Sequence, residues 1–220
     1  WSVNYYAANS GAFTPAPTGV ADSTYNLIPS AGRFGISDLK RQVQFERLLL
    51  DDFKAKSPMF LSNKPSNDID WLCLAQHHGI PTRLMDWTFN PLVALFFAIE
   101  NEIQADGAVY CAWPSSGLQA ESLIKGQEGV FNTSVEQVCH IVPSRTHARY
   151  QNQDGLFTLH PDPRKNKINN IIKKVIIPLS CKDSMKWRLR KMGITKRFIY
   201  ADLDGLSYDI LESTKRKLEL

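Results

Sequence analysis

The spacing of apolar residues predicts most of the helices in this chain. Apolar positions at helical intervals predict a helix over 38–56, and a second helix that Ser66 caps and that ends at the turn around Gly79. A third helix, from Pro91 to about Ile103, begins with turns that are apolar on every side, so we expect it to be buried. Further helices are predicted near 118–124, 146–152, 184–192 and 206–218.

Short runs rich in β-branched and aromatic residues predict strands. They lie at 82–88, 108–113, 139–142, 156–160, 171–179 and 197–201, and the run at 108–113 is expected to be central in its sheet. Because strands and helices do not alternate strictly, we expect an α+β fold: a single domain with a mixed β-sheet flanked by helices. Two prolines break residues 1–22, which are expected to form an irregular arm or a short edge strand ahead of a domain at 23–220.

The composition supports one globular domain. The chain has 220 residues, of which 43% are hydrophobic and 22% charged, and these values exclude a disordered, collagenous or coiled-coil chain. The longest apolar run has eight residues, Leu92 to Ile99, whereas a bilayer span needs about 20, so no membrane partner is expected. The four cysteines are scattered, which favours reduced thiols in a cytoplasmic protein.

Charge is distributed unevenly along the chain. Residues 1–163 hold 11 Lys and Arg against 16 Asp and Glu, while residues 164–220 hold 15 against 6. The basic C-terminal quarter could contact phosphate in a nucleotide or a nucleic acid. A solvated surface is the simpler interpretation of such a charge run.

The densest group of polar residues surrounds the two turns between 76 and 88. Gln76 and His77 precede the first turn, and Arg83, Asp86 and Thr88 follow it. In a structural interpretation Arg83 and Asp86 form a buried ion pair, with Arg83 donating its planar fork to a carboxylate or to backbone carbonyls. In a functional interpretation the group builds a site, because sites form where polar residues end regular elements. Neighbouring histidines face different directions, so no metal site is predicted.

This stretch resembles the signature of the FRG domain, a bacterial and phage family. Residues 75–88 read Ala-Gln-His-His-Gly-Ile-Pro-Thr-Arg-Leu-Met-Asp-Trp-Thr, and the pattern continues to Ala98. The L-x-P-S-x-x-R segment of the family resembles residues 27–33, its Q-x-G-x-F-x-x-H segment resembles 153–160, and its D-L-D-G-L segment resembles 202–206. The resemblance therefore covers about residues 17–206.

One position departs from the family. The aromatic-Arg-Gly motif that gives the family its name corresponds to residues 17–19, which read Pro-Thr-Gly, so Thr18 stands where the family has arginine. This copy is altered, or another basic residue substitutes for the arginine, or the N-terminal segment differs from that of the natural chain.

The resemblance also suggests an analogy with ADP-ribosyltransferases. Those enzymes hold NAD with an arginine or histidine on one strand, a Ser/Thr-ended strand followed by a helix, and a later Glu or Gln. Residues 86–98 resemble the second element and Gln153 the third, whereas the first is missing. The analogy implies an ADP-ribosyltransferase-like fold with NAD as cofactor. The candidate catalytic residues are Gln153, Thr88 and Asp86, and the candidate NAD-binding residues are Arg83, His77, Gln76 and Arg33.

Two functions from different classes stay open. One is an NAD-consuming transferase or glycohydrolase that acts as an effector in bacterial or phage conflict. The other is a non-catalytic module that binds a nucleotide, a nucleic acid or a protein. The polar residues of 76–88 favour the enzyme, and the loss of arginine at position 18 favours the module.

Overall fold

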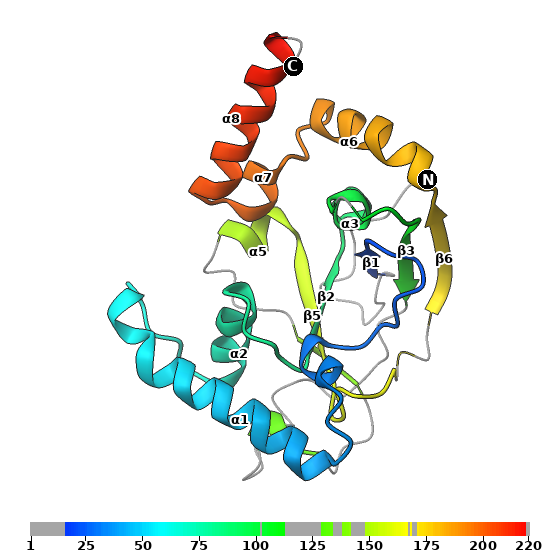
Figure 1. Cartoon of the computed structure of the whole chain (residues 1–220). Helices are drawn as coiled ribbons and strands as arrows, with labels where there is room; N and C mark the ends of the chain where they lie inside the picture. The colour runs from blue at the N-terminus through cyan, green and yellow to red at the C-terminus, as the bar shows by residue number, and fades with distance from the viewer. Residues whose placement is uncertain are drawn as a thin grey trace, which may run out of the picture.

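Helices and two small antiparallel sheets make up the described part of the chain (Figure 1). The computed structural model describes residues 16–101, 103–112, 129–133, 138–141, 148–166, 168 and 171–218. The helix predicted near 118–124 lies outside these residues, as do the first 15 residues of the predicted arm.

The first sheet contains β1, β3 and β6, with β3 in the centre. β3 (Gly107–Ala112) pairs antiparallel with β1 (Ala16–Val20) on one side and with β6 (Ile171–Ile177) on the other. The expected central position of this strand is therefore confirmed. Residues 1–22 were expected to form an irregular arm or a short edge strand. Residues 16–20 form a strand at the edge of this sheet.

The second sheet contains β2, β5 and β4, again all antiparallel. β5 (Gly155–Leu159) lies between β2 (Leu84–Thr88) and β4 (Cys139–Ile141). The α+β class is confirmed, but the expected single mixed sheet is replaced by two antiparallel sheets. The reason is the path of the chain after β2: the next helix leads it into the other sheet, so no parallel β-α-β unit forms in the described residues.

Seven α-helices surround the sheets in the described residues. Side chains of Asp38, Asn67, Asn90 and Asp202 accept backbone N–H groups at the starts of four of them, as N-caps do. The N-cap of the second helix is therefore Asn67, one residue after the predicted Ser66. The helices are α1 (Leu39–Lys56), α2 (Asp68–His77), α3 (Pro91–Ile99), α5 (Ala148–Asn152), α6 (Lys182–Lys191), α7 (Lys196–Tyr200) and α8 (Leu203–Lys217).

The prediction of a strand at 197–201 was wrong, because residues 196–200 form helix α7. The Thr195 hydroxyl caps this helix by accepting the Phe198 N–H at 3.3 Å, and Ala201 ends it in the left-handed conformation. A run of only five residues does not distinguish a strand from a helical turn by its apolar pattern. The cap at Thr195 therefore decides the outcome. Helix α3 also ends earlier than predicted, at Ile99.

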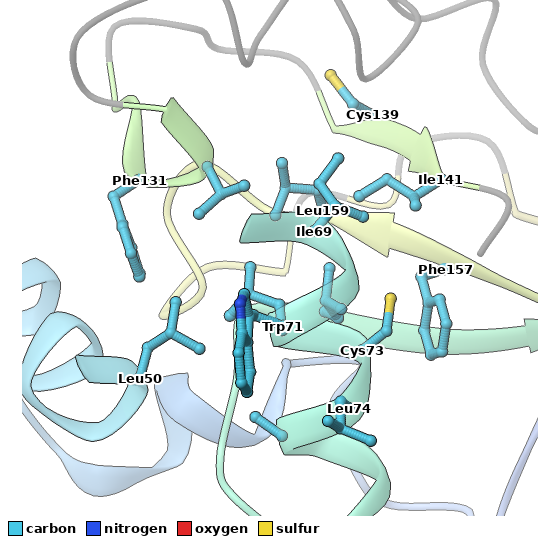
Figure 2. Close-up of a cluster of buried hydrophobic side chains, with 14 of the residues drawn as sticks. Leu50, Ile69, Trp71, Cys73, Leu74, Phe131, Cys139, Ile141, Phe157 and Leu159 are labelled. Atoms are coloured by element: carbon cyan, nitrogen blue, oxygen red, sulfur yellow. The ribbon is translucent and has the colours of Figure 1, made fainter. Parts of the chain in front are cut away.

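Three clusters of buried apolar side chains join the helices and the two sheets. Helix α2 packs on the second sheet, where Trp71, Leu74, Phe157 and Leu159 are buried (Figure 2). A second cluster joins the two sheets, and a third joins α3 to α6 and α7. In Figure 1 the C-terminal helices lie at one end of the molecule, and α1 and α2 lie at the other. No helix in the described residues is both long enough and apolar enough to cross a membrane.

Helix α3 is the buried helix that its apolar sequence predicts. Val93, Ala94, Phe96, Ala98 and Ile99 are buried. The expectation of nearly complete burial fails for Leu92 and Leu95, which are only partly buried. The apolar pattern predicts burial, but the neighbouring elements do not enclose this helix on every side.

Candidate functional site

A cavity of about 470 Å³ opens between β1, the 25–33 segment, α2, β2 and α5. Its volume lies within the range of about 300–1,000 Å³ that is usual for small-molecule sites. Five of the seven residues predicted from the sequence line it, although they come from distant parts of the chain: Arg33, Gln76, His77, Asp86 and Gln153. The remaining two, Arg83 and Thr88, are not among its lining residues.

Asp86 is the cavity's polar centre on strand β2. Its carboxylate accepts a 2.6 Å hydrogen bond from the Gln76 side-chain amide, and the Gln76 carbonyl oxygen in turn accepts the Thr82 hydroxyl. Solvent reaches Asp86 through the cavity, but protein encloses it on the other sides, and this desolvation raises the pKa of its carboxyl. The positive charge of Arg149 and the Gln76 hydrogen bond oppose that rise in pKa. Asp86 is thus an oriented carboxyl group suited to accepting or stabilising positive charge.

Gln153 reaches the cavity from the turn between α5 and β5. Its side-chain amide donates to the Ile199 carbonyl oxygen at 3.1 Å, and its backbone carbonyl accepts the Thr88 hydroxyl at 2.5 Å. Beside it, the Asn152 amide donates to the Phe198 carbonyl oxygen at 2.7 Å. Helix α7 therefore anchors the turn that carries Gln153.

Arg33 and His77 also line the cavity. Arg33 is exposed, and its Nε donates to the Ile28 carbonyl oxygen at 3.0 Å. The His77 ring is partly buried and meets the Tyr150 ring edge-on, with centroids 6.3 Å apart. Both side chains border the cavity.

Arg83 lies in the protein core. Its side chain is fully inaccessible, and its Nε and Nη2 donate to the two carboxylate oxygens of Glu46 at 2.8 and 3.0 Å. Its Nη1 also donates to the Val130 and Pro161 carbonyl oxygens. The planar fork was therefore predicted correctly, but its carboxylate belongs to Glu46, and the alternative of an Arg83–Asp86 ion pair was wrong. This placement supports a structural role and leaves the expected NAD contact without geometric support.

Thr88 is also buried, at the end of β2. Its hydroxyl donates to the Gln153 carbonyl oxygen and accepts the Asn90 N–H at 2.9 Å. These two bonds join the end of β2 to the start of α3 and to the Gln153 turn. The structure therefore gives Thr88 a positioning contact with Gln153.

The position of the family arginine also lies at this cavity. Thr18 lines it, and the neighbouring Gly19 packs against helix α3. A Cβ on Gly19 would lie 1.9 Å from the Ala94 carbonyl oxygen, so only glycine lets strand and helix approach this closely. Strand β1 therefore carries both the glycine that the family motif has and the cavity-lining position where the family has an arginine.

Sequence reasoning missed Glu46 and Arg149. Glu46 follows Gln42 and precedes Leu50 at intervals of four residues on one buried stripe of α1, and that spacing was a usable signal. Arg149 lies four residues before Gln153 in helix α5, and no local pattern in that helix indicates that it borders the cavity.

No set of three or more His, Cys, Asp or Glu side chains suited to holding a metal ion is found in the described residues. The cavity instead offers guanidinium groups, amides and a carboxyl, and donors of this kind fit a nucleotide with phosphates and ribose hydroxyls.

The match with known proteins concerns the N-terminal half of the domain. Residues 18–107 match the family model of the FRG domain, the family that the motifs of this sequence resemble. The segment includes Thr18, Gln76 and Asp86. Comparisons with curated proteins and with solved structures find no match.

Proposed function

We propose that this cavity binds NAD and that the protein is an ADP-ribosyltransferase-like enzyme or an NAD glycohydrolase. The observation that carries the proposal is the convergence of Asp86, Gln76 and Gln153 on one cavity. A carboxyl group and two amides can bind ribose hydroxyls and stabilise the positive charge that develops on the ribose when a glycosidic bond breaks.

The proposed reaction breaks the bond between the ribose and the nicotinamide nitrogen. Nicotinamide leaves as a neutral molecule with the bonding electron pair, and the ribose carbon becomes oxocarbenium-like. A water molecule or an acceptor nucleophile then forms the new bond and gives up a proton. Asp86 is the group we assign to stabilise the cation and to accept this proton, and Gln153 is the group we assign to orient the acceptor or a ribose hydroxyl.

Thr88 and Gln76 act on these groups through hydrogen bonds. Thr88 holds the backbone of Gln153, and Gln76 holds the carboxylate of Asp86. We propose conflict between bacteria and phages as the setting for this activity, because the resemblance is to a family that occurs in both.

The second candidate function is a non-catalytic module that binds a nucleotide, a nucleic acid or a protein. The observation that favours it is Thr18, which lines the cavity where the FRG family has an arginine. A threonine hydroxyl supplies no positive charge, so phosphate binding by that position is lost in this chain.

The test is release of nicotinamide from NAD by the wild-type chain and by Thr18→Arg, Gln153→Ala and Asp86→Asn. We expect turnover by the wild-type chain, a gain with Thr18→Arg and losses with the other two. The control is Asp52→Asn, which changes an exposed carboxylate on α1. An absence of turnover in the wild-type and Thr18→Arg chains, with no shift of their melting temperature in NAD, would leave only the binding module.

A further inference from the structure

Arg149 borders the cavity without a polar partner in the described part of the chain. Its side chain is partly buried on α5, and its guanidinium makes no hydrogen bond or ion pair with a described residue. A partly buried guanidinium normally bonds to a carboxylate or to carbonyl oxygens, because its five N–H donors otherwise lose hydration without compensation. Open donors beside a cavity are therefore available to a ligand.

An aromatic ring fixes the position of Arg149. The guanidinium carbon lies 4.9 Å from the centroid of the Tyr200 ring, and the Tyr200 hydroxyl donates to both carboxylate oxygens of Glu100 at 2.7 and 2.6 Å. A guanidinium that stacks on a ring keeps its in-plane N–H donors free for a planar or tetrahedral anion. Helix α7 thus holds the group in place without using its donors.

A second guanidinium borders the same cavity. Arg33 uses only its Nε internally, to reach the Ile28 carbonyl oxygen, and its two terminal nitrogens make no hydrogen bond with a described residue. Two guanidinium groups with open donors around one cavity suit a ligand that carries two linked anionic groups.

The acidic residues of the cavity already have partners. Glu100 accepts the Tyr200 hydroxyl and lies 3.5 Å from the Lys196 ammonium group, and Asp86 accepts the Gln76 amide. Arg149 acts on Asp86 electrostatically but forms no ion pair with it. The guanidinium groups are therefore not neutralised by direct contact with these carboxylates.

We infer that Arg149 and Arg33 bind the diphosphate of a nucleotide in this cavity, with Arg149 as the principal cation. The inference rests on the proposed function only in taking this cavity as the nucleotide site. It assigns the principal phosphate contact to Arg149 on α5, a residue that Tyr200 positions and that lies outside the matched segment 18–107.

The experiment measures binding of ADP-ribose, ADP and inorganic pyrophosphate by calorimetry at low and high salt. The variants are Arg149→Ala, Arg149→Lys and Arg33→Ala, and the control is Arg188→Ala, which removes an exposed arginine outside the cavity. We expect Arg149→Ala to weaken ADP-ribose binding about 10- to 150-fold, as loss of a charged hydrogen bond does. Arg149→Lys, which keeps the charge and checks folding, should bind with intermediate affinity, and Arg188→Ala should bind like the wild type.

The outcomes separate this inference from the proposed function. Equal affinity in wild-type and Arg149→Ala chains would overturn the inference, as would a wild-type chain that binds none of the three probes. Arg149-dependent binding of ADP-ribose without any NAD turnover would uphold the diphosphate site and reject the enzyme. NAD turnover with an unchanged KM in Arg149→Ala would uphold the enzyme and reject the site.

Discussion

Arg83 and Glu46 form a buried two-point ion pair that joins the residue before strand β2 to helix α1. The guanidinium donates to both carboxylate oxygens, at 2.8 and 3.0 Å, and the two residues are 0% and 3% exposed. The Gln42 amide also donates to the same carboxylate at 3.1 Å. This cluster orients the beginning of β2, the strand on which Asp86 lines the cavity.

Arg83→Ala should reduce the free energy of unfolding by about 3–5 kcal/mol, because it leaves the Glu46 carboxylate buried without its cation. Urea denaturation measures the change. The matched control is Lys56→Ala, which breaks the exposed Lys56–Asp52 pair and should cost less than about 1 kcal/mol. If Arg83→Ala does not fold, Glu46→Gln provides a milder test. Equal stability of the Arg83 and Lys56 variants would contradict the buried pair.

Gly19→Ala should destabilise the protein by about 1–3 kcal/mol or more, because the new methyl group would overlap the backbone of α3. Gly155→Ala is the control, since the nearest atoms to its added Cβ lie 3.9 Å away. Thermal unfolding of both variants measures the difference. Two melting temperatures equally close to that of the wild type would show that β1 does not pack tightly on α3.

Phe96→Ala should cost about 3–5 kcal/mol, because it opens a cavity between α3 and the C-terminal helices. Phe96 is 7% exposed, and its ring lies edge-on to Tyr200 with centroids 6.3 Å apart. Phe60 is 78% exposed, so Phe60→Ala should stay within about 0.5 kcal/mol of the wild type. Chemical denaturation that finds similar small losses for both would place α3 outside the core.

Helices were predicted best where the apolar pattern was long and the helix buries an apolar face or its whole surface. The helical spacing of α1 and the unbroken apolar run of α3 each predicted a helix, and both helices are present. Residues 197–201 were too short for the pattern to decide, and a contact from Thr195 made them helical.

The sequence predicted most of the residues that line the cavity, but it did not predict which residues they contact. Arg83 and Asp86 are three positions apart, and side chains an odd number of positions apart on an extended chain point to opposite faces. That rule argues against the Arg83–Asp86 ion pair that the sequence pattern left open. The contact of Arg149 with Tyr200 joins residues 51 positions apart, and no local pattern encodes such a contact.

Stability should fall in mild acid because of His160. This side chain is inaccessible, and burial, followed by the positive charge of Arg83 and by His140, lowers its pKa to about 4. The unfolded chain has a histidine pKa near 6.5, so between about pH 6.5 and 4 the unfolded state binds a proton that the folded state does not. The stabilisation is complete above this window and is lost as the pH falls through it, by roughly 3 kcal/mol.

Urea denaturation at pH 7 and pH 4.5 measures this loss. His160→Gln should show a smaller difference between the two pH values than the wild type, because the variant has no proton to take up at this position. The low pKa of Asp162, about 2, acts only at more acidic pH and does not enter the window. An identical pH dependence in both chains would assign the loss to other groups.

The central claim is that the cavity around Asp86 and Gln153 binds NAD, and the most direct measurement is a crystal structure of the chain grown or soaked with NAD. The account predicts density for the ligand inside this cavity, with its diphosphate at Arg149 and its ribose beside Gln153 and Asp86. Arg83 and Thr88 should lie behind the cavity wall without contact to the ligand. Density at another surface, such as the basic face of α6, or an empty cavity in crystals that hold saturating NAD, would contradict it.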